Sequence, residues 1–127
     1  MTNRIDSFKN AIRGIRMVFK SERNMQIHLI VAFLVVIAGS FFGLSITEWC
    51  LCFLCFGLVM GAEMINTAIE SVVDLASPQK HKLAGKAKDI AAGAVLICAI
   101  ISACIGLVIF VPKIINFFPK IITFFSN

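Results

Sequence analysis

The chain has 127 residues, of which 59% are hydrophobic and 15% charged, and its mean hydropathy is +0.93. This composition is too apolar for an ordinary soluble domain and predicts a small integral membrane protein. The net charge of +5 indicates membrane topology and attraction to anionic lipid headgroups, so membrane lipids are expected partners. No basic segment carries the interleaved aromatic residues of a nucleic-acid reader, and we therefore expect no nucleic-acid partner.

Residues 1–24 are predicted to form an amphipathic helix on the membrane surface. Apolar side chains recur there at spacings of three and four, while basic residues occupy the other faces. Packing of the apolar face on the protein's own helices is equally compatible with the pattern. The segment is too charged for a cleaved signal peptide, so we expect the whole chain in the mature protein. The apolar residues are Ile5, Phe8, Ile12, Ile15 and Phe19.

Three transmembrane helices are predicted next, at 26–47, 49–76 and 78–112. Each contains an apolar stretch long enough to cross roughly 30 Å of hydrocarbon at about 1.5 Å per residue. Ser77 and Pro78 form a helix-start signal, so the third helix is expected to begin before it enters the membrane. The tail, 113–127, repeats a Lys-Ile-Ile-x-Phe-Phe pattern and is predicted to be an interfacial anchor. The fold class is thus an all-α membrane protein with a single domain, 1–127.

Basic residues set the predicted topology. Lys and Arg are concentrated before the first span and in the connection at 77–89, whereas the turn at 45–48 contains none. The positive-inside rule then places the N-terminus and the 77–89 segment in the cytoplasm, and the 45–48 turn and the tail outside. All five cysteines lie in predicted spans, where Cys52 and Cys55 are interpreted as small hydrophobic residues and not as a redox or metal pair.

The second predicted span carries an unusual polar stripe formed by Glu63, Asn66, Glu70 and Asp74. On a helical wheel these residues fall at about 0°, 300°, 340° and 20°, so they share one face of the helix. A carboxylate at mid-bilayer costs on the order of 2.5 to 3.5 kcal/mol even on the lenient insertion scale. The stripe must therefore face protein, water or a cation, and it is the first candidate for a functional site.

Depth divides this stripe into two parts. If the span enters the hydrocarbon near Trp49, Glu63 lies roughly 8 Å inside the cytoplasmic boundary, while Glu70 and Asp74 emerge at or beyond it. Glu63 could then reach a lipid hydroxyl, and the outer carboxylates could hold Mg²⁺ together with substrate phosphates. The basic start of the third helix adds cations suited to phosphate groups. A cation or proton path and a purely structural role remain as alternatives at this stage.

Two segments closely resemble the signature of the prokaryotic diacylglycerol kinase family. They are Gly-Ala-Glu-Met-Ile-Asn-Thr-Ala-Ile-Glu-Ser-Val-Val-Asp at 61–74 and Lys-Ala-Lys-Asp-Ile-Ala-Ala-Gly-Ala-Val at 86–95. The resemblance extends over roughly residues 5 to 110. It implies a homotrimer of three-span subunits in the bacterial inner or plasma membrane. It also implies transfer of the γ-phosphate of MgATP to a lipid alcohol at the cytoplasmic face.

The same resemblance assigns expected roles to individual residues. Glu63 matches the general base that takes the proton of the lipid hydroxyl, and Asn66 falls on a polar position of the active site. Glu70 and Glu22 match the ligands of Mg²⁺ that also contact ATP. The remaining matches are positions associated with the nucleotide or with the architecture of the site, and they are Asp74, Gly85, Lys88 and Asp89.

Two histidines bear on the substrate. The stretch from Asn24 to His28 resembles the undecaprenol kinase branch of the family, because the classical diacylglycerol branch carries an acidic residue at the position of His28. This favours undecaprenol as acceptor, with diacylglycerol as the alternative. His81 lies among the lysines of the 77–89 segment, where contact with ATP and a solvated surface position are both compatible with the sequence.

Overall fold

The computed structural model describes residues 3–126, and within this range it consists of four helices. They are α1 (Arg4–Ser21), α2 (Arg23–Phe42), α3 (Ile46–Ala76) and α4 (Lys82–Phe125). The last three are long and apolar enough to cross a membrane, which confirms the predicted all-α fold with three spans. Residues 1, 2 and 127, which belong to the predicted surface helix and tail, lie outside the described range.

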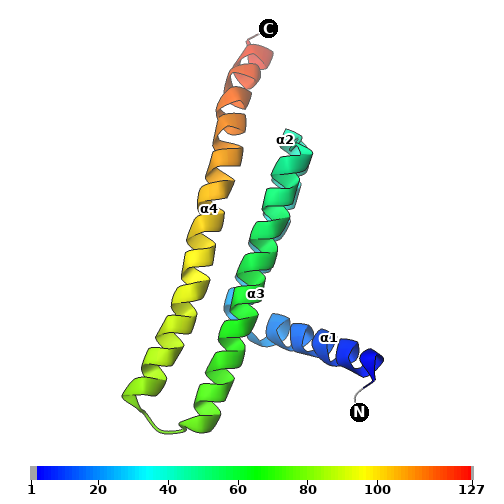
Figure 1. Cartoon of the computed structure of the whole chain (residues 1–127). Coiled ribbons are helices and arrows are strands. Elements are labelled where there is room, and N and C mark those ends of the chain that lie inside the picture. The colour runs from blue at the N-terminus through cyan, green and yellow to red at the C-terminus, as the bar shows by residue number, and fades with distance from the viewer. Residues whose placement is uncertain (1–2, 127) are drawn as a thin grey trace.

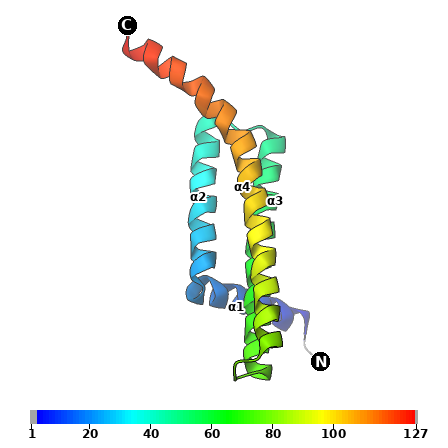
Figure 2. The same ribbon diagram turned by 90° about the vertical axis from the view of Figure 1, so that its left-hand side faces the viewer.

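The three long helices lie side by side, and α1 projects from one end of them (Figures 1 and 2). A short corner at Glu22 separates α1 from α2. The Gln26 side-chain amide closes this corner by donating to the backbone carbonyl of Lys20 at 3.2 Å. The apolar face of α1 is not covered by the chain, since Ile5 and Phe8 are 61% and 74% exposed. That face is therefore free to contact lipid or another polypeptide.

A tight turn joins α2 to α3. Gly43 ends α2 with φ at 69°, a backbone conformation that favours glycine, and the next residue, Leu44, is buried. Ser45 and Glu48 then form a capping box, in which each side chain accepts a hydrogen bond from the other residue's backbone N–H, at 3.2 and 2.8 Å. Glu48 also pairs with Lys113 of α4 at 3.1 Å, so this end of the bundle is held by polar contacts.

The buried core is small and lies toward the end of the bundle that contains this turn. Leu44, Cys52 and Ile109 form it, with Trp49 and Phe56 among the side chains packed against it. The five cysteines are free thiols, and Cys52 is buried as a small hydrophobic residue. Most of the large apolar side chains of the spans are exposed, as expected for surfaces that face lipid tails or further subunits.

The start of α4 differs from the prediction. We expected the third span to begin at Pro78 with Ser77 as its cap, but α4 begins at Lys82, and the His81 imidazole Nδ1 accepts a hydrogen bond from the backbone N–H of Leu83 at 3.1 Å. The Ser77 hydroxyl instead donates to the Gln79 carbonyl at 3.0 Å, which stabilises a turn. Ser77 and Pro78 thus lie in the loop before α4 and do not start the helix.

The other end of α4 extends through most of the predicted tail. Its 44 residues span roughly 66 Å at about 1.5 Å per residue, about twice the thickness of the hydrocarbon core. Pro112 and Pro119 lie inside the helix, and each removes one backbone hydrogen bond and favours a kink. Figure 2 shows the last part of α4 turning away from the axis of the rest of the helix.

Candidate active site

The polar stripe of α3 passes from buried to exposed along the helix. Glu63 is 1% exposed and Asn66 is 6% exposed, and they are the buried polar or charged residues of the described chain. Glu70 is half-buried, and the side chain of Asp74 is 65% exposed. Within the chain, Glu63 is thus the most enclosed residue of the stripe and Asp74 the most exposed, whereas their depth in the bilayer stays a prediction.

Hydrogen bonds hold parts of the stripe in place but leave others without a partner. The Asn66 side-chain amide donates to Glu70 Oε1 at 3.4 Å, and the Thr67 hydroxyl donates to the backbone carbonyl of Glu63 at 3.0 Å. Within residues 3–126, Glu63 Oε2 and Asn66 Oδ1 are buried without a hydrogen-bond partner. Two acceptor oxygens on adjacent turns are therefore available to a donor from outside the subunit, such as a substrate hydroxyl.

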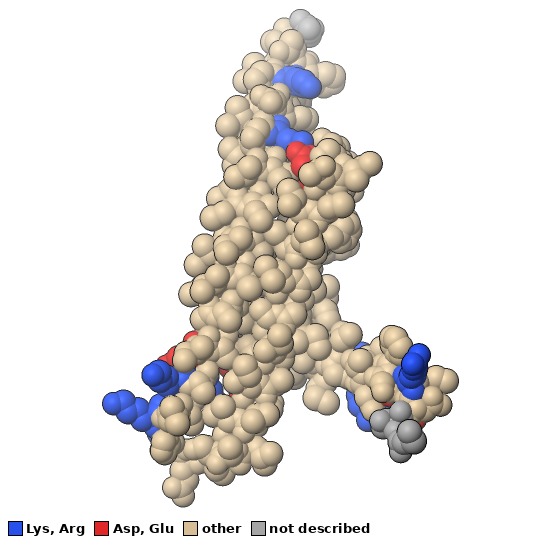
Figure 3. Space-filling model, in the orientation of Figure 1, with Lys and Arg blue, Asp and Glu red and all other residues tan. Residues whose placement is uncertain are grey.

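The nucleotide residues expected from the sequence gather where α3 ends and α4 begins. Lys88 forms an ion pair with Asp74, which ties the two helices together. Both line a polar hollow of about 480 Å³ that also includes Gly85 and the backbone around His81. The hollow is also lined by Lys80 and Lys82, so several basic groups gather there. On the face shown in Figure 3, charged side chains lie on α1 and near the two ends of the long helices, and the band between them carries none.

Two of the predicted site residues are not joined to this cluster within one subunit. Glu22 lies at the corner between α1 and α2, where its carboxylate accepts a hydrogen bond from the Ser21 hydroxyl at 3.0 Å. Asp89 is exposed on α4, next to Lys88. The described residues contain no group of three His, Cys, Asp or Glu side chains that could hold a metal ion.

The oxygen donors that are present nevertheless fit Mg²⁺. This ion uses one or two carboxylates together with substrate phosphates and water, and it does not need a complete protein cage. Glu70 is half-buried and held by Asn66, so its second oxygen is positioned without being enclosed. Carboxylates in this arrangement would suit a metal ion held jointly with a phosphate ligand.

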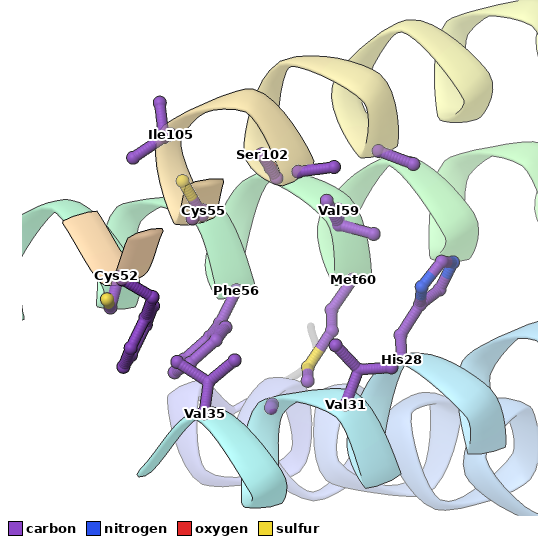
Figure 4. Close-up of a pocket in the computed structure, with 15 residues that line it drawn as sticks. His28, Val31, Val35, Cys52, Cys55, Phe56, Val59, Met60, Ser102 and Ile105 are labelled. Carbon is purple, nitrogen blue, oxygen red and sulfur yellow. The ribbon is translucent and has the colours of Figure 1, made fainter. Parts of the chain in front are cut away.

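A groove of about 310 Å³ lies between α2, α3 and α4, on the membrane side of the polar stripe (Figure 4). Its walls are almost entirely apolar and include Val31, Phe56 and Met60. His28 lines the end of the groove nearest α1, and Met60 lies one helical turn before Glu63 on α3. A hydrocarbon chain in this groove would be bordered by side chains that suit it.

Sequence reasoning did not identify two polar atoms in this groove. His28 Nε2 and Ser102 Oγ are both buried without a hydrogen-bond partner within residues 3–126. Ser102 lies in an apolar run of α4 where the sequence offers no periodic signal that separates it from other small residues. His28 was noted only through the resemblance, because its orientation toward α3 depends on how α2 packs.

These features define a class of protein. The chain is a helical membrane protein with three spans, an apolar groove, a buried carboxylate one helical turn beyond that groove on α3, and a hollow lined by lysines where α3 ends and α4 begins. Such a pairing of lipid depth with phosphate-binding groups is the arrangement that a lipid-modifying phosphotransferase requires.

Comparison with known proteins identifies the family. The model of the prokaryotic diacylglycerol kinase family matches residues 9–110, so the chain belongs to this family and is a lipid kinase. It is 49% identical over 108 residues to an undecaprenol kinase of Bacillus subtilis, covering 85% of this chain and 88% of that protein. It is 39% identical over 115 residues to a diacylglycerol kinase of Synechocystis, covering 90% and 66% of the two chains.

A third relative, a diacylglycerol kinase of Haemophilus influenzae, is 32% identical over 97 residues, covering 76% of this chain and 82% of that protein. The resemblance inferred from the two sequence segments is thus confirmed. Family membership also shows that the chain is a lipid kinase and not a cation-conducting or accessory membrane protein.

Proposed function

We propose that this lipid kinase transfers the γ-phosphate of MgATP to a polyisoprenol, with undecaprenol favoured over diacylglycerol. Undecaprenyl phosphate would be the product. The reaction would take place at the end of the bundle where α3 meets α4, on the cytoplasmic side of the bacterial inner or plasma membrane. The observation that carries the proposal is the burial of Glu63, with one carboxylate oxygen lacking a partner, beside an apolar groove.

Glu63 is the proposed general base. Its free oxygen accepts the hydrogen bond of the lipid hydroxyl and takes the proton as the hydroxyl oxygen attacks the γ-phosphorus. Asn66 Oδ1, which also lacks a partner, orients the hydroxyl through a hydrogen bond or accepts from a bound water. The apolar surroundings exclude bulk water, which limits hydrolysis of ATP in place of transfer to lipid.

Glu70 and Glu22 are the proposed ligands of Mg²⁺, with the remaining positions filled by ATP phosphates and water. When bound, the ion offsets negative charge on the phosphates. Lys88 exchanges part of its contact with Asp74 for a nucleotide phosphate, and Gly85 leaves room for close approach of the nucleotide. Asp89 is proposed to orient the basic groups near the transferred phosphate.

Glu22 is proposed to act in a site shared between neighbouring subunits of a homotrimer. Within one chain, Glu63, Asn66 and Glu70 lie together on α3, but Glu22 lies at the corner between α1 and α2. A subunit of this size also presents little concave surface by itself. A second copy offers a direct way to supply the missing carboxylate.

The acceptor is proposed from two observations. First, the match between this chain and the Bacillus subtilis relative named undecaprenol kinase covers 88% of that relative's length. Second, the groove next to the Met60–Glu63 turn of α3 is lined almost entirely by apolar side chains, which suits an isoprenoid chain, and His28 at its end offers an unpartnered Nε2 to a hydroxyl group.

The decisive experiment offers undecaprenol and diacylglycerol separately, and then together, to the purified protein with MgATP in mixed micelles. Transfer of labelled phosphate to each lipid is measured after separation of the products. We expect a higher kcat/KM for undecaprenol and preferential labelling of it in competition. Preference for diacylglycerol would overturn the acceptor, and labelling of neither lipid would overturn ATP-dependent transfer to these alcohols.

A further inference from the structure

The end of the molecule opposite Glu63 carries a structure that the family match does not include. That match ends at residue 110, whereas α4 continues to Phe125. The extension packs on α2 through aromatic rings, because Phe117 lies edge-on to Phe41 and Phe42 at centroid distances of 5.3 and 5.9 Å. These contacts hold the first turns after Pro112 in a defined position.

A hollow of about 320 Å³ lies where the extension meets α2. Lys113, Asn116 and Lys120 are spaced three and four residues apart, so their side chains leave α4 on one face. Aromatic rings from both helices form the remaining wall. The hollow is lined by Phe41, Phe42, Lys113, Asn116, Phe117 and Lys120.

The charges of this hollow leave one positive charge uncompensated. Lys113 Nζ lies 3.1 Å from Glu48 Oε2, and the two side chains are similarly half-buried. Lys120 has no carboxylate partner in the part of the chain that the structure describes. Two ammonium groups and one carboxylate give a local charge of about +1, which matches the single negative charge of a phosphate diester.

The sequence places one side of the hollow at a predicted boundary between the hydrocarbon and the headgroups. Lys113 directly follows the apolar run of the third predicted span, which ends at Pro112. Its partner Glu48 directly precedes Trp49, the first residue of the second predicted span. Both charged groups therefore lie at a boundary between hydrocarbon and water. Aromatic rings and lysines at this level characteristically contact lipid headgroups.

We propose that this hollow is a binding site for the phosphate of an anionic phospholipid in the leaflet at the Ser45 end of the molecule. The Lys120 ammonium supplies the uncompensated charge, and the Asn116 amide donates to a phosphate oxygen. The rings of Phe41 and Phe117 pack against the glycerol and upper acyl chain. The site is separate from the phosphotransfer site. It anchors the part of α4 that continues beyond residue 110, where the family match ends.

The test uses the single tryptophan of the chain. Trp49 packs against the same core cluster as Phe42, and Phe42 lines the hollow, so a lipid bound there would lie within the range over which bromine quenches the indole. Purified full-length protein is reconstituted in vesicles in which brominated phosphatidylglycerol or brominated phosphatidylcholine replaces an increasing fraction of the lipid, and quenching of tryptophan fluorescence is measured. We expect phosphatidylglycerol to quench at a mole fraction several times lower.

Three variants locate the effect. Lys120→Gln should reduce the preference for phosphatidylglycerol about fivefold, as expected for loss of one cation near a membrane surface. Lys120→Arg should keep the preference, and Lys9→Gln, which removes the same charge from α1, should leave it unchanged. Equal quenching by the two lipids, or an undiminished preference in Lys120→Gln, would overturn the proposal.

Inorganic phosphate distinguishes a lipid from a free anion as the source of the phosphate. Added at millimolar concentration, it should leave quenching by phosphatidylglycerol unchanged if the acyl chain and aromatic rings contribute to binding. Displacement of the lipid would overturn the lipid as ligand and assign the hollow to a soluble phosphate. Kinase activity is not used as the readout, so failure of the proposed acceptor would not affect the result.

Discussion

Glu63 is the residue whose position most needs a functional explanation. It is almost fully buried in a helix that crosses the membrane, and one of its carboxylate oxygens has no hydrogen-bond partner within the described chain. A charge at membrane depth is costly, and an unsatisfied polar atom adds to that cost. A binding partner that supplies a hydrogen bond during the reaction accounts for both features.

Replacing Glu63 with Gln tests its role as base. Glutamine keeps the size of the side chain but cannot accept a proton, so we expect turnover to fall by about 10²- to 10⁴-fold. Binding of MgATP should change little, because the residue is assigned to the lipid hydroxyl. Turnover and the KM for ATP are measured with saturating lipid.

Asp6→Asn is the matched control, since Asp6 is an exposed carboxylate in the first turn of α1. It should retain the turnover of the parent protein. Near-normal turnover in Glu63→Gln would contradict the assignment, whereas loss of ATP binding would move Glu63 into the nucleotide site.

At the scale of the elements, close packing between α2 and the start of α3 positions the bundle. Gly39 is buried on α2, and a Cβ atom built there would lie 2.8 Å from the Trp49 ring. The adjacent turn depends on the positive φ of Gly43 and on the Ser45–Glu48 capping box. Together these features allow α2 and α3 to pack without a long connection.

Gly39→Ala should therefore destabilise the protein. The added methyl group must displace the indole ring or separate the helices, and overpacking of this kind typically costs about 1 to 3 kcal/mol. The free energy of unfolding is measured by denaturant titration in detergent micelles. Trp49 fluorescence reports the local change, because it is the only tryptophan.

Gly14→Ala provides the comparison. Gly14 is in α1 and has no atom within 4 Å of the position of its added Cβ. Alanine also favours a helix over glycine by about 1 kcal/mol, so stability should be unchanged or slightly higher. Equal effects of the two substitutions would contradict specific packing at Gly39.

At the scale of the whole molecule, a single copy of the chain leaves large apolar surfaces uncovered and leaves the Glu22 carboxylate apart from the other predicted site residues. The apolar face of α1 is exposed, most lipid-facing side chains are uncovered, and Glu22 is not joined to the α3 cluster. An assembly in which neighbouring copies complete each site would use both the exposed faces and Glu22.

Mixing two inactive variants tests this shared site. Glu63→Gln subunits and Glu22→Gln subunits are unfolded, combined in equal amounts and reassembled in lipid. If each site takes Glu22 from one subunit and Glu63 from another, about a quarter of the sites will contain both native carboxylates. Kinase activity of the mixture is compared with that of each variant alone.

Return of activity to roughly that fraction is the expected result. Parent protein mixed with itself by the same procedure controls for losses during reassembly. If the mixture remains as inactive as the separate variants, each subunit must contain a complete site, and the assignment of Glu22 to a neighbour would be wrong.

Sequence alone determined the class of membrane protein, the three spans and the polar stripe of α3. These features depend on local quantities, because hydrophobic length sets a span and spacings of three and four set a helical face. The two family segments were recognisable for the same reason, since their residues are contiguous.

Only the tertiary structure decided how the helices end and what they enclose. The start of α4 at Lys82 depended on which residue capped the helix, and the Ser77 hydroxyl stabilises a turn while the His81 imidazole accepts from the backbone N–H of Leu83. The groove beside His28 and the hollow beside Lys113 each require side chains from two or three helices. Their contacts arise from packing between distant segments, and a helical period carries no information about which faces meet.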